Sequence, residues 1–303
     1  RCRWPASISH ASFPNPFTHG FPMTLQDQRK VYDVCIVGSG AGGGMAAYML
    51  TQAGANVVLL EAGGPWDNAT DSDMFTWPYN SPRRGASTKE RPFGEFDACV
   101  GGWELPGEPF TVAEGSKFGW WRARMVGGRT NHWGRISLRF GPNDFRRKSL
   151  DGLGDDWPIS YDDLAPYYDR VDDLIGIFGS AEGLPNEPDG HFLPAPRPRC
   201  YELLVKQACD NLKVACIPAR LSILTQPLGN RPACHYCGQC NRGCAVNANF
   251  SSTNVLLPPA MATGRLTMIT NAMAREVTLG SNGLADGVTY VDKATNTDRR
   301  VRA

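Results

Sequence analysis

Four cysteines crowd into a short segment of the chain: Cys234, Cys237, Cys240 and Cys244. Their spacing, C-x₂-C-x₂-C-x₃-C, is that of the iron–sulfur run of bacterial ferredoxins. In ferredoxins a proline follows the fourth cysteine, which serves a second cluster. Here Ala245 follows it, and three local ligands would suit a three-iron cluster or would need another donor. The run therefore predicts iron–sulfur ligands.

Three other roles for these cysteines stay open. Zinc is disfavoured because four ligands in so short a run are cramped for a tetrahedral site built from two separated knuckles. Disulfides are disfavoured because Cys-x-x-Cys pairs in a chain without a recognisable secretion signal are more often redox or metal sites. Free thiols are the remaining alternative. Most of the other six cysteines are expected to be small buried apolar residues.

A second group of residues suits a dinucleotide. Gly38, Gly40 and Gly43 form the pattern G-x-G-x-x-G. In that pattern the first glycine permits a tight turn, the second lets the backbone approach a pyrophosphate, and the third lets a helix pack on a strand. Glu61 follows at the distance of the acid that accepts hydrogen bonds from ribose hydroxyls.

The segments around these residues are those that the pattern requires. A β-branched run over 31–37 predicts a strand, helix formers over 45–53 predict a helix that stops at Gly54, and 56–61 predict a second strand. Strand, glycine turn, helix and strand make a βαβ unit. A glycine turn without a ligand is the alternative, and this pattern alone does not separate NAD from FAD.

Downstream segments separate the two cofactors. Their sequences are RMVGGRTNHWGR over 124–135, DWPISYDDLAPYY over 156–168, STNVLLP over 252–258 and GRLTMIT over 264–270. With these motifs the chain resembles the glucose-methanol-choline oxidoreductases from about Tyr32 to its end. The resemblance implies that the cofactor is FAD.

The resemblance also implies which residues lie along the FAD. They are Gly127, Gly128, Thr130 and Asn131, with backbone groups near Ala272 and Met273 holding the adenine in a strand expected over 266–274. A Gly-Gly step beside short polar side chains is what close backbone approach to a ligand needs. The alternative for 127–131 is an ordinary helix-start turn.

His132 has two expected roles. In pyranose-oxidising relatives a matching Gly-Gly-x-x-x-His-Trp segment carries the flavin on its histidine, although Gly134 stands here where those relatives have threonine. The resemblance thus implies a covalent bond between His132 and the flavin. The alternative is a histidine that only packs or hydrogen-bonds near the ring.

The expected fold is α/β: a Rossmann-like FAD-binding domain with an inserted, incomplete α+β substrate domain. The expected divisions are a disordered lead over 1–30, the first part of the FAD-binding domain over 31–150, a partial substrate domain with the cysteine run over 151–262, and a truncated return to the FAD-binding domain over 263–303. The proline-containing stretch before Met23 has no apolar core of a secretory signal, and Met23 is the expected native start.

The function implied by the resemblance is oxidation of a CH–OH donor, an alcohol, sugar or sugar acid, with hydride transfer to flavin N5. The resembled enzymes use a histidine near their C-terminus as the base; no histidine here matches it, and the catalytic residues are expected beyond Ala303. An iron–sulfur centre would pass electrons singly to a cytochrome or quinone, or to a small-subunit electron-transfer partner, and favours a dehydrogenase. The alternatives are an oxygen-using oxidase and a non-catalytic flavoprotein subunit.

Composition limits the partners. The formal net charge is +1, from 31 basic and 30 acidic residues, so the charge balance argues against nucleic acid. No stretch approaches the roughly 18 consecutive apolar residues of a transmembrane helix. The expected location is the cytoplasm, or the periplasm by export with a partner subunit.

Overall fold

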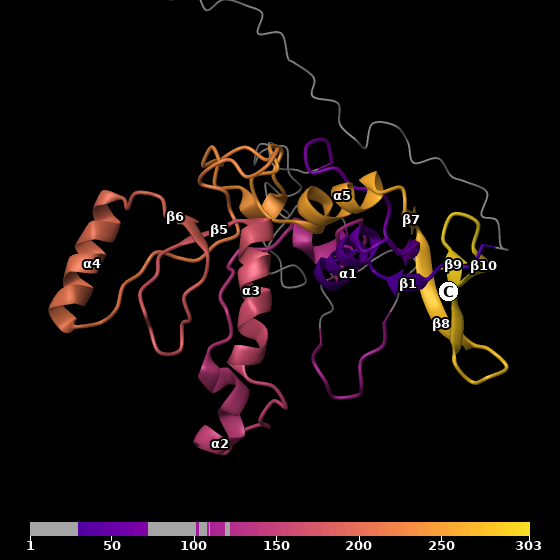
Figure 1. Ribbon diagram of the computed structural model, residues 1–303, viewed down its shortest axis with the longest axis horizontal. Helices are drawn as coiled ribbons and strands as arrows, with labels where there is room; N and C mark the ends of the chain where they lie inside the picture. Colours follow the sequence, from indigo (N-terminus) through magenta and orange to yellow (C-terminus); the bar gives the residue numbers. More distant parts are fainter. Residues whose placement is uncertain (1–29, 72–100, 103–107, 109, 119–121) are drawn as a thin grey trace, which may run out of the picture.

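A three-stranded parallel sheet organises the first part of the chain. The computed structural model describes residues 30–71, 101–102, 108, 110–118 and 122–303. Its parallel sheet contains β1 (Val34–Val37), β2 (Val57–Leu60) and β7 (Leu266–Ile269) in the order β1-β2-β7. The helix α1 (Ala41–Gln52) joins β1 to β2. A strand from the end of the chain thus lies beside two strands from its start (Figure 1).

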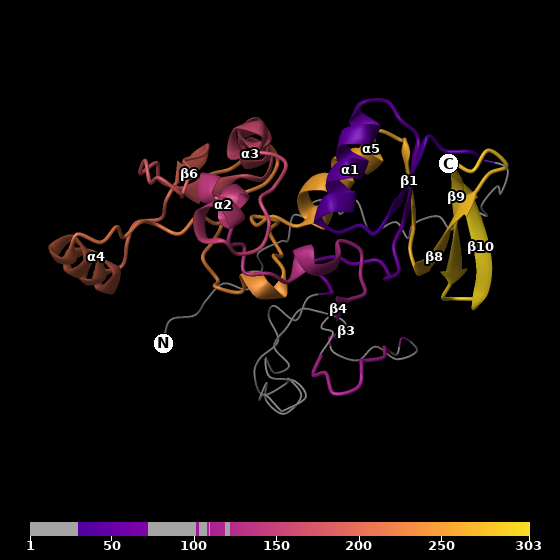
Figure 2. The ribbon, with the colours of Figure 1, turned by 90° about the horizontal axis from the view of Figure 1, so that it is seen from below.

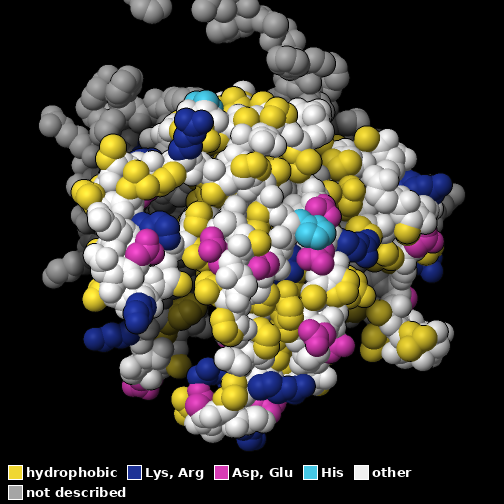
Figure 3. Space-filling model, turned by 60° about the vertical axis from the view of Figure 1, so that its left-hand side comes forward, with side chains coloured by type: hydrophobic (Ala, Val, Ile, Leu, Met, Phe, Trp, Pro, Cys, Tyr) yellow, Lys and Arg dark blue, Asp and Glu magenta, His cyan; other side chains and the backbone are white. Residues whose placement is uncertain are grey.

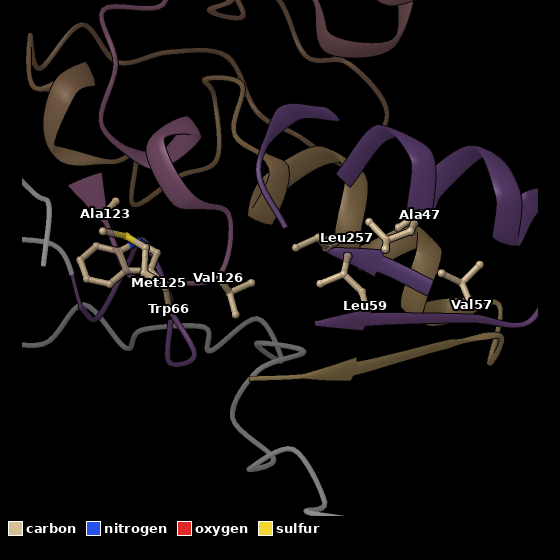
Figure 4. Packing of buried hydrophobic residues seen from close by; sticks show 9 residues of the cluster. Ala47, Val57, Leu59, Trp66, Ala123, Met125, Val126 and Leu257 are labelled. Atoms are coloured by element: carbon tan, nitrogen blue, oxygen red, sulfur yellow. The ribbon is translucent and has the colours of Figure 1, made fainter. Parts of the chain in front are cut away.

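The central strand β2 is buried on both faces, as its unbroken apolar sequence VVLL requires. Val57 and Leu59 pack with Ala47 of α1 and with Leu257 of α5 (Leu257–Ala262), as Figure 4 shows. On the other face, Val58 and Leu60 pack against a second sheet. The strand therefore lies between a layer of helices and a layer of strands (Figure 2).

The second sheet is antiparallel, in the order β10-β9-β8. Its strands are β8 (Ala272–Leu279), β9 (Ala285–Asp292) and β10 (Thr297–Arg302). The single strand expected over 266–274 is wrong, because the chain breaks between β7 and β8. Asn271 has a left-handed φ of 55° there, and its N–H donates to the carbonyl of Gly63 at 2.9 Å. The break moves the chain from one sheet to the other.

The middle of the chain has little sheet and several helical segments. Its elements are β3 (Gly101–Gly102), β4 (Arg122–Ala123), η4 (Gly128–Asn131), η5 (Pro142–Arg146), α2 (Arg147–Asp151), α3 (Tyr161–Ile175), β5 (Ile177–Gly179), β6 (Phe192–Pro194), α4 (Cys200–Leu212), η6 (Cys240–Arg242) and the π-helical turn η7 (Ser252–Leu256). Ser160 caps α3, since its N–H and hydroxyl both donate to the carboxylate of Asp163 at 2.8 Å. The chain is thus mixed α/β.

The helices differ in how firmly they are held. Ile175 of α3 packs with Ile177, Phe250 and Val255 in a second core. In contrast, α4 has no buried residue and stands at the far end of the molecule from the two sheets (Figures 1 and 2). Apolar, acidic and basic side chains are interspersed on the face shown in Figure 3. Among the described residues, no helix is long and apolar enough to cross a membrane.

Candidate cofactor site

The glycine turn after β1 is built as its pattern predicts. Gly38 has a left-handed φ of 89°, and its N–H donates to the carbonyl of Leu60 at 2.8 Å. A Cβ on Gly43 would overlap the carbonyl oxygen of Gly38 and lie 3.1 Å from Ile36 Cγ2. The turn therefore needs glycine for conformation at one position and for space at the other. It delivers the chain to the start of α1, where N–H groups of the first turn have no helical acceptor.

A cavity of about 410 Å³ opens at this turn. Its lining combines the carboxyl ends of β1 and β2 with β4, the start of η4 and the start of β8, which is where open α/β sheets bind ligands. The lining residues are Val37, Gly38, Ser39, Gly40, Leu60, Glu61, Ala62, Arg122, Ala123, Arg124, Gly128, Arg129, Ala272, Met273 and Ala274. Gly38, Gly40, Glu61, Gly128 and Met273, all expected from the sequence, are thereby brought together.

Glu61 is held rigidly at the wall of the cavity. Its side chain is buried, and Oε2 accepts hydrogen bonds from Ser39 N at 2.9 Å and Ser39 Oγ at 2.5 Å. Its other oxygen accepts from Gly63 N at 2.8 Å. Because an ionised carboxylate accepts at several lone-pair sites, these three bonds fix its orientation and leave capacity for a ligand hydroxyl.

Ser39 joins the two glycine signatures, and sequence reasoning missed it. Its hydroxyl donates to Glu61 and accepts a hydrogen bond from Gly127 N at 2.8 Å, and the whole residue is inaccessible to solvent. Residue 39 is an unspecified position in G-x-G-x-x-G, so the pattern gives no weight to it. The only available clue was a short hydroxyl side chain between two required glycines.

The second signature meets the first at the cavity. Gly127 and Gly128 both have left-handed φ values, 85° and 51°. A Cβ on Gly127 would lie 2.8 Å from Thr253 Cγ2 and 2.9 Å from Asn131 Nδ2, which is too close for an ordinary contact. A Cβ on Gly128 would come within 4.0 Å of the Cα of Gly40. The two glycine-rich backbones therefore lie against each other where Gly40 and Gly128 line the cavity.

Thr130 and Asn131 are buried, and their side chains bond to other parts of the protein. Thr130 Oγ1 donates to the carbonyl of Gly127 at 2.5 Å and accepts from Ser252 N at 2.9 Å. Asn131 Nδ2 donates to the carbonyl of Val126 at 2.8 Å. Neither residue lines the cavity. These bonds shape the turn that presents Gly127 and Gly128; direct contact of Thr130 and Asn131 with FAD stays a prediction.

His132 is buried at the end of η4 and is also outside the cavity lining. Burial, with the charges of Arg129 and Arg135, lowers the pKa of its imidazole to about 4. The ring is therefore neutral at physiological pH. A neutral ring keeps a nitrogen lone pair, as nucleophilic attachment to a flavin requires, but the covalent bond stays a prediction.

Basic residues form one wall of the cavity. Arg122, Arg124 and Arg129 line it. The buried carboxylate of Glu108 accepts from Arg124 Nε at 2.7 Å and from Lys293 Nζ at 2.6 Å. Burial opposes ionisation of Glu108, but the bonds from Lys293 and Arg124 outweigh it and lower its pKa. Arg122 is the third cation paired with this one carboxylate, at 4.0 Å, and the excess positive charge suits a phosphate-bearing ligand.

The cysteine run forms a separate loop. Gly238 and Gly243 have left-handed φ values of 72° and 101°, and the sulfur of Cys244 accepts from Ala248 N at 3.2 Å. Burial raises the pKa of the Cys240 thiol, and the charge of Arg135 lowers it by less. The charges of Cys234, Cys244 and Cys237 raise it further. The four thiols thus influence one another. Within the described part of the chain, no group of three or more His, Cys, Asp or Glu side chains is placed to hold a metal ion. The metal site therefore stays a prediction.

Two buried arginines adjoin the cysteine run. Arg135 is fully buried and donates to backbone carbonyls, among them Asn131 O at 2.8 Å and Cys240 O at 2.7 Å. Arg231 likewise donates to Ile175 O at 2.9 Å and Asn249 O at 3.2 Å. Burial lowers the pKa of each guanidinium to about 10. The charge of Cys244, and for Arg135 also that of Cys240, acts in the opposite direction and raises the pKa. Neither forms an ion pair with a carboxylate in the region that the structure describes. Two buried positive charges therefore remain to be balanced.

Most of the chain is similar to a known protein family. The family model described as GMC oxidoreductase matches residues 36–303. The chain is 31% identical to 2-methyl-1,2-propanediol dehydrogenase of Mycolicibacterium austroafricanum over 89% of this chain and 47% of the relative. It is 28% identical to paromamine 6'-oxidase of Streptomyces fradiae over 99% of this chain and 51% of the relative.

Two further relatives extend the comparison. The chain is 28% identical to the fructose dehydrogenase large subunit of Gluconobacter japonicus over 72% of this chain and 41% of the relative. Its fold matches the crystal structure of pyridoxine 4-oxidase from Mesorbium loti with a TM-score of 0.52 and 19% identity, over 90% of this chain and 48% of that one. The chain spans about half the length of the curated relatives it matches.

Proposed function

Because the chain belongs to the GMC oxidoreductase family, we propose that it forms the FAD-binding part of an enzyme that oxidises CH–OH donors. The donor class is an alcohol, sugar or sugar acid, and the enzyme is a dehydrogenase that passes electrons to a cytochrome or quinone. The observation that carries the proposal is the hydrogen-bonded chain from Glu61 through Ser39 to Gly127. It joins the dinucleotide turn to the second glycine signature around one cavity.

The residues around the cavity fit FAD. Gly40 and Gly128 leave the backbone open at the cavity, where a Cβ on Gly40 would meet nothing within 4 Å and one on Gly128 only a distant neighbour. The start of α1 offers N–H groups and a partial positive charge to a pyrophosphate. Glu61 would accept from the ribose hydroxyls, and the backbone of Ala272 and Met273 would face the adenine. Each part of an adenosine diphosphate moiety has a complementary group.

The bound flavin would supply the acceptor for the hydride of the CH–OH donor. The work of this chain is to hold that cofactor in place. Ser39 and Gly63 fix the Glu61 carboxylate, the hydroxyl of Ser39 fixes Gly127, and Thr130 fixes the turn against Ser252. His132, kept neutral by burial and by its arginine neighbours, would be the nucleophile if the flavin is attached covalently.

An iron–sulfur cluster on Cys234, Cys237, Cys240 and Cys244 is the second part of the proposal. Cysteine thiolates around such a cluster carry negative charge. Arg135 and Arg231 are buried beside this run without a carboxylate partner in the described part of the chain, and buried charges are costly unless they are paired. An anionic cluster would balance them, and a one-electron centre would pass the electrons on singly.

The test uses the full-length protein, purified anaerobically. We expect FAD and iron to co-purify, an alcohol or sugar to bleach the flavin, and a one-electron acceptor to restore its colour faster than oxygen does. Cys237→Ser should keep substrate bleaching but slow transfer to the acceptor; Cys200→Ser, at an exposed free thiol, is the matched control. Fast reoxidation by oxygen with no iron would favour an oxidase, and a flavin that no CH–OH donor bleaches would indicate a non-catalytic subunit.

Acid precipitation tests the bond to His132. We expect flavin to stay with the precipitated parent protein and to pass into the supernatant for His132→Ala. Complete release from the parent would exclude the bond.

A further inference from the structure

Two more cysteines lie together at the outer end of α4. Cys209 is in the last turn of the helix, and Cys216 is in the extended segment that follows it. The two thiols lie close enough to influence each other, because the charge of Cys216 raises the pKa of Cys209. Both side chains are half-buried, so solvent reaches them. Figures 1 and 2 show α4 far from the two sheets that form the cofactor cavity, and this pair has no part in the function proposed above.

Backbone geometry brings the pair together. The helix ends at Leu212, and Lys213 takes a left-handed φ of 56°. Lys213 N donates to the carbonyl of Asp210 at 3.1 Å, and Val214 N donates to that of Cys209 at 2.9 Å. Such bonds close a helix and turn the chain back along it. Cys216, two residues after Val214, is thereby returned to the side of Cys209.

The helix that carries Cys209 has no buried residue that would anchor it to the rest of the described chain. Its apolar stripe is exposed to solvent, with Tyr201, Leu204, Val205 and Leu212 all more than half exposed. A helix of 13 residues without tertiary packing is marginal in water. A covalent link between α4 and the segment after it would restrict the unfolded chain and favour the helical end.

We infer that Cys209 and Cys216 form a redox-active dithiol that closes to a disulfide across the end of α4. With a hydroperoxide as oxidant, the two thiols lose two electrons and two protons, the O–O bond breaks, an S–S bond forms, and two waters leave when the peroxide is hydrogen peroxide. Burial and then the charge of Cys216 raise the pKa of Cys209, so the two do not ionise together. One thiolate therefore attacks the peroxide, and the other thiol displaces water from the sulfenic acid.

Cys200, the other cysteine of α4, cannot pair with Cys209. Cys200 is the first residue of the helix, nine residues before Cys209, which corresponds to about 13 Å along the axis. Disulfides join Cα atoms about 4.4–6.8 Å apart. Cys200 is also exposed, which makes it an internal reference for unselective thiol oxidation.

The sequence allows a clean peptide assay. Trypsin cleaves after Lys206, Lys213 and Arg220, so Cys209 falls in 207–213 and Cys216 in 214–220, and only a disulfide can join these peptides. The folded full-length protein is treated with hydrogen peroxide, alkylated, denatured, digested without reductant and analysed by mass spectrometry. We expect the joined pair from the monomer band, its loss after prior reduction or in Cys209→Ser, and its retention in Cys200→Ser.

Three results would overturn the inference. Alkylation of Cys209 and Cys216 to the same extent as Cys200, with no joined pair, would show that the two thiols do not react together. Linkage found only in a dimer band would make it a contact between molecules. Linkage of either thiol to the run over 234–244 would show that the pairing assigned here is wrong.

Discussion

Replacing Ser39 with alanine tests the link between the two glycine signatures. The substitution removes the 2.5 Å hydrogen bond that the Ser39 hydroxyl donates to Glu61. It also leaves Gly127 N without its acceptor, because this N–H donates to the same hydroxyl oxygen at 2.8 Å. A buried donor left unsatisfied costs about 1–3 kcal/mol, and a hydrogen bond to a charged group is worth about 1.5–3 kcal/mol. Because both bonds share one oxygen atom, we expect a loss of about 2–4 kcal/mol in the free energy of unfolding, not the full sum.

The same substitution should weaken FAD binding. Glu61 keeps its bonds from Ser39 N and Gly63 N, so its carboxylate stays near its place while Gly127 and Gly128 lose their tie to it. A loss of about 1–2 kcal/mol in binding corresponds to roughly a 5- to 30-fold rise in the dissociation constant. Ser281→Ala, at an exposed turn residue between β8 and β9, is the control for loss of a hydroxyl alone.

Two measurements decide the outcome for Ser39. Urea unfolding followed by tryptophan fluorescence gives the stability. Titration with FAD of flavin-free protein, prepared with His132→Ala so that no flavin is attached covalently, gives the affinity. If Ser39→Ala and Ser281→Ala unfold at the same urea concentration and bind FAD equally, the bridge from Glu61 to Gly127 does not hold the site together.

Three further predictions concern other parts of the chain. Gly44→Ala should destabilise the protein by about 1–3 kcal/mol, because its Cβ would overlap the buried hydroxyl of Ser252. Gly42→Ala in the same helix meets nothing within 4 Å and should stabilise the protein by about 0.5–1 kcal/mol. Equal unfolding midpoints for the two variants would refute this packing. The folded pKa of His132, about 4, lies below its ordinary 6.5, so between these values the unfolded chain binds a proton that the folded protein does not. The stability that the neutral His132 side chain contributes is complete above about pH 6.5 and falls toward pH 4. Acidification from pH 7 to 4.5 should therefore lower the free energy of unfolding of the parent more than that of His132→Gln. Parallel curves of stability against pH would contradict this. Iron and sulfide analysis should find at least about three irons per chain in the parent and a loss in Cys237→Ser; less than about one iron in the parent would exclude the cluster.

The sequence was informative where one residue type is required by the backbone or by burial. The run VVLL favours a strand, which the structure buries on both faces. Gly38 has a left-handed φ that residues with a side chain rarely adopt. These local requirements place the turn and the strand that ends before Glu61. The helix begins at Ala41, four residues before its expected start, since Gly42, Gly43 and Gly44 all lie inside it. Close packing on Gly38 and Ser252 decides that boundary, and helix propensity does not reveal it.

The remaining features depend on partners far apart in the sequence. Ser39 matters because Gly127 lies beside it, and nothing near residue 39 announces that contact. Arg135 carries a charge that normally keeps a side chain at the surface, yet it is fully buried against the carbonyls of Thr130, Asn131, Phe250 and Cys240. The break between β7 and β8 depends on the bond from Asn271 N to Gly63 O. Each is a consequence of tertiary packing that overrides local preference.

The most direct test of the account is the choice of dinucleotide. The full-length His132→Ala protein, which cannot hold the flavin covalently, is stripped of cofactor and titrated with FAD and separately with NAD by calorimetry, and the titrations are repeated after Ser39→Ala is added. The account predicts one FAD site per chain, weakened in the variant, and no comparable heat with NAD. Tight binding of NAD together with no detectable binding of FAD would contradict the proposed FAD site, because the cavity between Glu61 and Gly128 would then hold a different dinucleotide.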